Sequence, residues 1–176
     1  MMYSKELNAD ELKDIQNIKN KIEKNSETID KIVDDIIKPY CKDLDKYIRF
    51  IRNCLKDGEN PPTTEELDDW CLNLSTFIYF AGGLCERLGI RDDIGKAVYK
   101  EMYHSQRASI DKGTVADKDS LAELASQEEA ITSACYTRAY KTMKSKVENA
   151  QELLQSCKKV LSRRMQEQEL TKISNY

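Results

Sequence analysis

The sequence predicts an all-α protein in which long antiparallel coiled-coil helices, N-terminal and C-terminal, flank a short helical hairpin. Apolar residues recur at the three- and four-residue steps of a helix face along most of the chain, and no segment shows the two-residue alternation of a β-strand. The 176 residues include only six glycines and three prolines, so few positions interrupt a helix. Charged residues make up 34% of the chain, which favours long helices with solvated faces.

The first predicted helix, within residues 1–57, carries a coiled-coil seam. Its isoleucines recur every seven residues, with others at the complementary position: Ile15, Ile18, Ile22, Ile29, Ile32 and Ile36. Asn25 interrupts the seam, and a polar residue there commonly fixes register and oligomer state. Pro39 predicts a kink, because proline cannot donate a backbone hydrogen bond. The simplest packing lays this helix along the C-terminal one.

Residues 63–112 are predicted to form the two-helix core hairpin. Thr63 and Glu66 have the spacing of a capping box, which starts a helix. The broadest apolar face of the chain follows: Leu67, Trp70, Cys71, Leu74, Phe77, Ile78, Ala81, Leu84 and Leu88. Gly82 and Gly83 lie within this helix and allow either a close helix–helix contact or a local break.

A turn at residues 89–93 is predicted to divide the hairpin. Asp92 or Asp93 would then cap a further helix that ends near Ile110. Asp-Lys-Gly-Thr at residues 111–114 predicts the next turn.

The last predicted helix spans residues 114–170, because Thr114 and Asp117 can cap its start and no glycine or proline follows. Uninterrupted, it would be about 75 Å long. Its seam consists of Tyr136, Tyr140, Met143, Val147, Ala150, Leu154, Cys157 and Leu161. We expect one structural domain and a homo-oligomer, with the seams closing either within or between chains.

The residues that enzymes and metal sites require are sparse. The glycines fit no phosphate-binding loop, His104 is the only histidine, and no CxxC pair occurs among six cysteines. We therefore expect no catalytic residues, no metal and no cofactor, and reduced thiols. The start of the sequence lacks the apolar core of a signal peptide, and no apolar run is long enough to span a membrane. These features predict a cytoplasmic protein.

The C-terminal helix is strongly basic in an otherwise acidic chain. Residues 138–164 hold eight basic and two acidic side chains, whereas the whole protein has a net charge of −3. Lysine and arginine neutralise phosphates without reading sequence, so this helix is the candidate nucleic-acid surface. Its candidate residues are Lys141, Lys144, Lys146, Lys158, Lys159, Arg163 and Arg164. The first seventy residues hold 17 acidic against 12 basic side chains, so pairing with the N-terminal helix is the competing interpretation.

Two segments carry a resemblance to a known family. Gly-Thr-Val-Ala-Asp-Lys at residues 113–118 leads into a long helix that reads ELLQSCKKVLSRRM at residues 152–165. This is similar to small helical proteins encoded near phage recombinases and single-strand binding proteins, and it resembles the recombination mediator family UvsY of T-even phages. The resemblance covers about residues 113–168. It implies a non-enzymatic, ring-forming protein of the host cytoplasm that binds single-stranded DNA and helps load a recombinase onto DNA covered by single-strand binding protein.

Two functions thus follow from the sequence. The first is an oligomeric phage-type protein that binds single-stranded DNA and assists recombinase loading. The alternative is a structural or adaptor coiled-coil protein, such as a virion component or assembly scaffold, without a nucleic-acid role.

Overall fold

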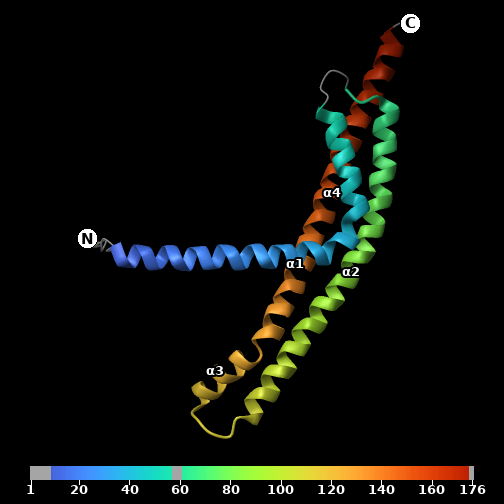
Figure 1. Ribbon diagram of the computed structural model, residues 1–176. Coiled ribbons are helices and arrows are strands. Elements are labelled where there is room, and N and C mark those ends of the chain that lie inside the picture. Colours follow the sequence, from blue (N-terminus) through green and yellow to red (C-terminus); the bar gives the residue numbers. More distant parts are fainter. Residues whose placement is uncertain (1–8, 57–60, 175–176) are drawn as a thin grey trace, which may run out of the picture.

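Four helices make up the computed structural model, which describes residues 9–56 and 61–174. In chain order they are α1 (Ala9–Lys56), α2 (Thr64–Ser109), α3 (Val115–Ala125) and α4 (Gln127–Ser174) (Figure 1). No strand occurs among these residues. The all-α class with long antiparallel helices is confirmed. The predicted end of the first helix, at residues 57–62, lies partly outside the described residues, and α1 ends at Lys56.

The long antiparallel pair is α2 with α4, which run side by side along most of their length (Figure 1). Tyr140 lies against Gly89, and Ser133 lies against Gly95, so ascending positions on α4 meet descending positions on α2. Near the other end, Cys157 and Cys71 are close enough to influence each other electrostatically. The predicted apolar faces of both helices are buried along this contact.

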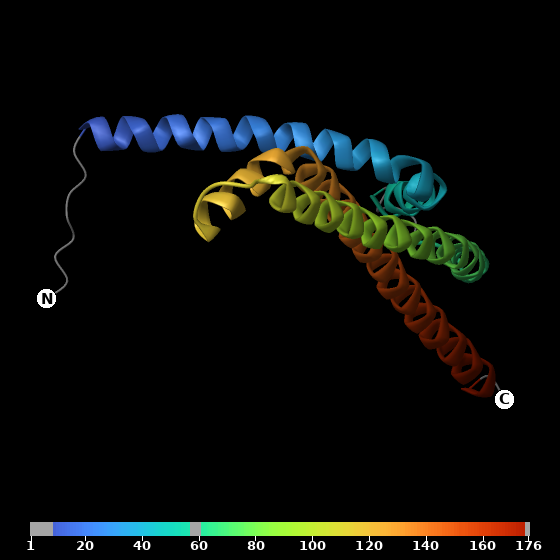
Figure 2. The ribbon, with the colours of Figure 1, turned by 90° about the horizontal axis from the view of Figure 1, so that it is seen from below.

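Helix α1 has two parts with different surroundings. We call residues 9–32 the arm and residues 33–56 the bundle segment. The bundle segment buries Val33, Ile37, Cys41, Leu44 and Ile51, and its C-terminal part lies on the α2–α4 pair as a third helix (Figure 1). Helix α1 turns sharply before its C-terminal part joins the bundle, and the arm projects away from the α2–α4 pair (Figures 1 and 2). Pro39 lies inside this helix, and a proline within a helix kinks it.

The bundle segment runs in the same direction as α4. Asp45 of α1 contacts Lys146, and Pro62, in the connection that follows α1, contacts Arg164 nearer the C-terminal end of α4. This direction follows from the connections, because the chain reverses once between α1 and α2 and again between α2 and α4. The isoleucine seam of the arm is not laid along α4 as expected, since Ile15, Ile18 and Ile22 are 50%, 60% and 62% exposed.

The predicted turn at residues 89–93 does not form, and α2 is continuous through it. The glycine at position 89 lets α2 pack closely against α4, because a Cβ atom there would lie 3.2 Å from the Tyr140 ring. Asp92 caps no helix but is buried in the middle of α2. Gly82 and Gly83 neither break α2 nor mark a close contact, since a Cβ atom at either would meet nothing within 4 Å.

The predicted single C-terminal helix is interrupted at Ser126, which separates α3 from α4. Ser126 is buried and donates its hydroxyl to the Ala122 carbonyl. Such local hydrogen bonding by serine offers the backbone an alternative to a continuous helix. The start was predicted correctly, because Thr114 and Asp117 form a reciprocal capping box. Thr63 and Glu66 form the other predicted box, at the start of α2.

The three long helices share one hydrophobic core. It joins the bundle segment of α1 to the inner faces of α2 and α4 and includes Trp70, Leu74, Leu88 and Met143. Cys41, Cys71, Cys85 and Cys157 belong to it as small apolar side chains. All six cysteines are free thiols.

Candidate nucleic-acid interface

Lys141 and Lys159 project from one face of α4. They are eighteen residues apart, which is about five turns of an α-helix. Both line hollows between α4 and α2. We call the hollow at Lys141, nearer the start of α4, the lower hollow, and the hollow at Lys159, nearer the end of α4, the upper hollow. Lys146, which contacts α1, points about 140° away from Lys141 on a regular helix. The two hollows therefore lie on a side of the α2–α4 pair that α1 leaves open.

The lower hollow has a volume of about 420 Å³ and a positive lining. Arg138 and Lys141 are its only charged lining residues, and Tyr99 of α2 forms the opposite wall. The remaining lining is small: Ala130, Ser133, Ala134 and Thr137. Cations beside an aromatic side chain and a small-residue floor suit a phosphate next to an unpaired base.

The upper hollow is larger, about 880 Å³, and mixed in charge. Lys159 lines it together with Glu148 and Glu152 of the same helix, and Tyr79 of α2 lies on the other side. The two carboxylates oppose an anion at this end. The positive potential of the open side is therefore concentrated at the lower hollow.

Lys144 and Lys158 are exposed on α4 and lie near α2. Burial raises the pKa of the Cys85 thiol of α2, and the charge of Lys144 is close enough to act on it. Burial likewise raises the pKa of the Cys71 thiol, on which the charge of Lys158 acts. Lys141, Lys144, Lys158 and Lys159 form no ion pair within the part of the chain that the structure describes. We call these four the open lysines.

Lys146 does not belong to this surface. Its ammonium group lies 2.9 Å from both carboxylate oxygens of Asp45 on α1. The Cys41 thiol donates to the same carboxylate. Burial first, and then this hydrogen bond, raise the pKa of Cys41 to about 11. Lys146 therefore joins α1 to α4.

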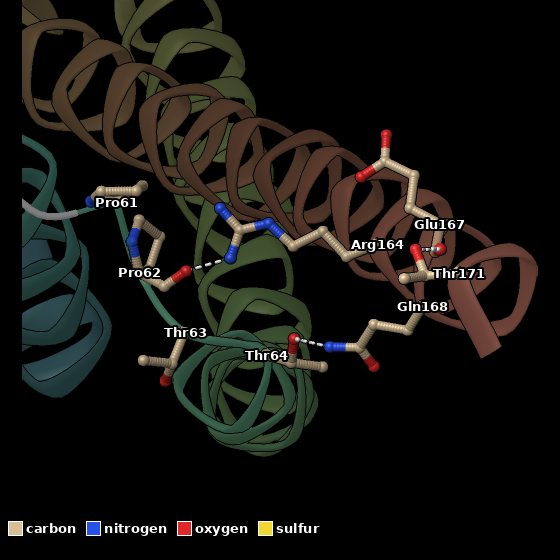
Figure 3. A pocket seen from close by; sticks show the side chains of 8 residues that line it. All are labelled: Pro61, Pro62, Thr63, Thr64, Arg164, Glu167, Gln168 and Thr171. Carbon is tan, nitrogen blue, oxygen red and sulfur yellow. Dashed lines mark hydrogen bonds between the residues drawn. The ribbon is translucent and has the colours of Figure 1, made fainter. Parts of the chain in front are cut away.

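Arg163 and Arg164 also have partners within the chain. Arg163 lies 3.5 Å from Glu167 on the exposed side of α4. Arg164 donates to the Pro62 carbonyl, and Gln168 contacts the hydroxyl of Thr64 at 3.5 Å (Figure 3). Figure 3 shows these side chains bridging from α4 to the segment that starts α2. Arg164 thus holds the end of the bundle together.

A buried polar contact lies beside the lower hollow. The Thr137 hydroxyl of α4 and the Lys96 ammonium group of α2 both donate to Asp92. Burial alone would raise the pKa of Asp92, but the hydrogen bonds from Lys96 and Thr137 outweigh it and hold the pKa below its usual value. Asp92 therefore stays charged and couples α2 to α4 at neutral pH.

Sequence reasoning missed the residues that α2 contributes to the open side. Tyr79 and Tyr99 line the two hollows, but only the pairing of α2 with α4 brings them beside the lysines. Arg138 was part of the charge excess and could have been included on that signal. Tyr136 and Tyr140 were expected to serve the core, and both pack against it.

The described residues show few features of a catalytic site, a metal site or a membrane span. His104 is exposed and lies edge-on to Tyr103. No group of three or more histidine, cysteine or acidic side chains is placed to hold a metal ion among the residues that the structure describes. None of the described helices is long and apolar enough to cross a membrane.

No family model, curated protein or solved structure matches the chain.

Proposed function

We propose that the protein binds single-stranded DNA along the open side of the α2–α4 pair. The observation that carries the proposal is the set of open lysines, which lie on the same helix as the two hollows and form no ion pair with a carboxylate among the described residues. The competing interpretation required these cations to be paired with acidic residues of the N-terminal helix. Of the seven candidates, only Lys146 has such a partner among the described residues.

Phosphates would sit against the open lysines and Arg138, and unpaired bases would stack on the tyrosines of α2. Stacking on an aromatic side chain is worth about 1–3 kcal/mol per base and tolerates any base. A duplex hides its bases from such contacts, so the tyrosines favour single strands. The mixed charge of the upper hollow makes the lower hollow, with Tyr99, the stronger contact.

In this proposal the protein acts without catalysis, in the cytoplasm of a host cell if a phage encodes it. By its resemblance to recombination mediators, it would hold a strand so that a recombinase can be loaded in place of single-strand binding protein. Those two proteins are its proposed partners.

The test is fluorescence anisotropy with a labelled oligonucleotide across a salt series. Each phosphate that a lysine neutralises contributes about −0.7 to the slope of log affinity against log salt for a single strand. The double variant Lys141→Ala/Lys159→Ala should therefore bind more weakly and flatten the slope by about 1.4. The matched control is Lys38→Ala/Lys42→Ala, which removes two exposed lysines of α1 and should leave the slope unchanged.

Tyr99→Ala separates stacking from charge. It should weaken single-strand binding by about 1–3 kcal/mol and leave the salt slope unchanged. Equal losses in the α1 control, or no binding even at low salt, would rule out this interface.

The contact between Lys146 and Asp45 favours a second candidate, a structural or adaptor protein whose basic helix serves packing. For such a protein the salt series would give no binding, and Lys141→Ala/Lys159→Ala would have no effect.

A further inference from the structure

The arm carries an apolar seam that its own chain leaves open. Ile15, Ile18, Ile22 and Ile32 are all exposed large apolar residues. They occupy the first and fourth positions of successive heptads, so they form one narrow stripe. Ile29 and Ile36 continue the stripe at the base of the arm, where they are half-buried against the core. The open part of the seam is thus the part that projects from the bundle (Figure 2).

The helical state of the arm has little support within the chain. Its described side-chain contacts are local, such as Gln16 with Asn20 at 2.9 Å and Lys19 with Glu23 at 3.8 Å. Most helices in proteins gain their stability from packing an apolar face. A helix that presents a heptad seam to solvent is therefore incomplete without another helix.

We propose that the arms of several copies of this chain pack together as a parallel, in-register coiled coil. The seam is its own complement, because a strict heptad stripe fits the same stripe on an identical helix. The open seam runs from Ile15 to Ile32. Ile36, half-buried against the core, completes its third heptad at the base of the arm, and three heptads is the length at which the pattern becomes typical of a coiled coil. The arm also stands clear of the bundle, so other copies can reach its seam (Figure 1).

Asn25 sets the orientation. It occupies the fourth position of its heptad, between Ile22 and Ile29 in the seam. In a parallel, in-register assembly Asn25 meets the Asn25 side chains of the other copies, and the amides can hydrogen-bond one another. In an antiparallel assembly, first positions face fourth positions, so Asn25 would face an isoleucine and lose its partner. A buried polar group without a partner is unfavourable.

The flanking charges are compatible with the same arrangement. In parallel coiled coils, the seventh position of one heptad faces the fifth position of the next heptad on the neighbouring helix. Lys21 then faces Ser26, so no like charges meet at these positions. Isoleucine at both seam positions favours three or four strands over two. The assembly is therefore a trimer or tetramer, and it does not depend on DNA binding.

A second surface could compete for the arm of another copy. Arg91, Ile94, Val98 and Tyr136 line a hollow of about 420 Å³ between α2 and α4, with Glu128 and Glu129 at its edge. A helix bound there would leave the arms unpaired with one another. The seam does not favour this site, because its narrow heptad stripe matches a like helix.

The mass of the full-length chain in solution, from light scattering after size exclusion, tests the assembly. The wild type should have three or four times the chain mass. Ile18→Lys/Ile22→Lys should be monomeric, with the bundle intact because both residues are exposed in the single chain. Ile90→Lys, at an equally exposed isoleucine of α2, is the matched control and should keep the wild-type mass. A monomeric wild type, or arm variants of unchanged mass, would overturn the proposal.

Two further variants test the surface and the orientation. Ile94→Lys should keep the wild-type mass, whereas loss of assembly would place the arm in the α2–α4 hollow instead. Ile18→Cys should form an intermolecular disulfide on mild oxidation, because residue 18 meets residue 18 only in the parallel arrangement. The wild type, with five of its six cysteines buried, is the control. No disulfide in an assembled Ile18→Cys protein would exclude the parallel register.

Discussion

The two parts of α1 share one helix and one style of apolar spacing, yet they have opposite surroundings. Ile51 in the bundle segment is 1% exposed, whereas Ile22 in the arm is 62% exposed. A heptad pattern thus indicates that a helix face needs a partner, but it does not say where the partner is. The bundle segment finds its partner because the connection to α2 folds the chain back on itself, and no such reversal serves the arm.

Contacts across helices mark the same boundary. In the bundle segment, the Tyr47 and Phe77 rings lie 5.1 Å apart, and the Arg91 guanidinium lies 5.6 Å from the Tyr40 ring centre. In the arm the polar contacts join residues four positions apart, as in the 3.0 Å bond from Thr28 to the Lys24 carbonyl. The bundle segment is therefore fixed by tertiary structure, while the arm depends on what another molecule supplies.

The largest expected difference between the two parts comes from the same substitution made in each. Ile51→Ala should lower the free energy of unfolding by about 2–5 kcal/mol, because it leaves a cavity in the core. Ile22→Ala should change the stability of the bundle by no more than about 0.5 kcal/mol. Urea unfolding followed by the fluorescence of Trp70, which is buried in the bundle, measures both. Similar losses at the two sites would mean that the stability of the bundle depends on packing of the arm, and the same losses at low and high protein concentration would place that packing on its own bundle.

A smaller effect is expected from the polar contact that couples α2 to α4 below the arm. Asp92→Asn removes the charge that Lys96 and Thr137 stabilise and should cost about 1–3 kcal/mol at neutral pH. Because the pKa of Asp92 is lowered in the folded state, its contribution is complete above the pKa of the unfolded chain, about 4. The contribution is lost as the pH falls through the folded-state value.

The difference in unfolding free energy between wild type and Asp92→Asn should therefore shrink as the pH falls from 7 toward 3. Asp93→Asn is the matched control, because the neighbouring Asp93 carboxylate is exposed and comes no closer than 4.0 Å to the Lys96 ammonium group. A difference that is constant with pH would show that the charge of Asp92 carries none of the coupling.

Local features of this fold could be predicted from the sequence. The capping boxes at Thr63 and Thr114 depend on residues three positions apart, and both formed. The buried stripes of α2 and α4 follow from helical periodicity alone. The turn expected at Gly89 did not form. The glycine makes room for the ring of Tyr140, fifty-one residues away, and does not serve a local turn. A glycine can mark either a turn or a close packing contact, and the sequence alone cannot distinguish the two without the tertiary contact.

The candidate site divides in the same way. Its lysines were visible as a charge excess, but their availability was not. Lys146 and Arg164 were equally good candidates until α1 and the start of α2 were placed beside them. The tyrosines of α2 could not be assigned to the site at all, because no sequence pattern shows which face of α2 lies beside the open side of α4.

The smallest expected effect is a difference in coupling energy between two ion pairs, one from each part of α1. Lys146 and Asp45 join two helices and are partly buried, whereas Lys19 and Glu23 lie four residues apart on the exposed arm. A double-mutant cycle to alanine should give up to about 1 kcal/mol for the first pair and about 0.3–0.5 kcal/mol for the second. The larger value follows from weaker solvent screening and from the second hydrogen bond to Asp45. If the arm pair couples as strongly as the bundle pair, the arm must be packed in solution, and the cycle repeated in Ile18→Lys/Ile22→Lys would show whether other copies supply that packing.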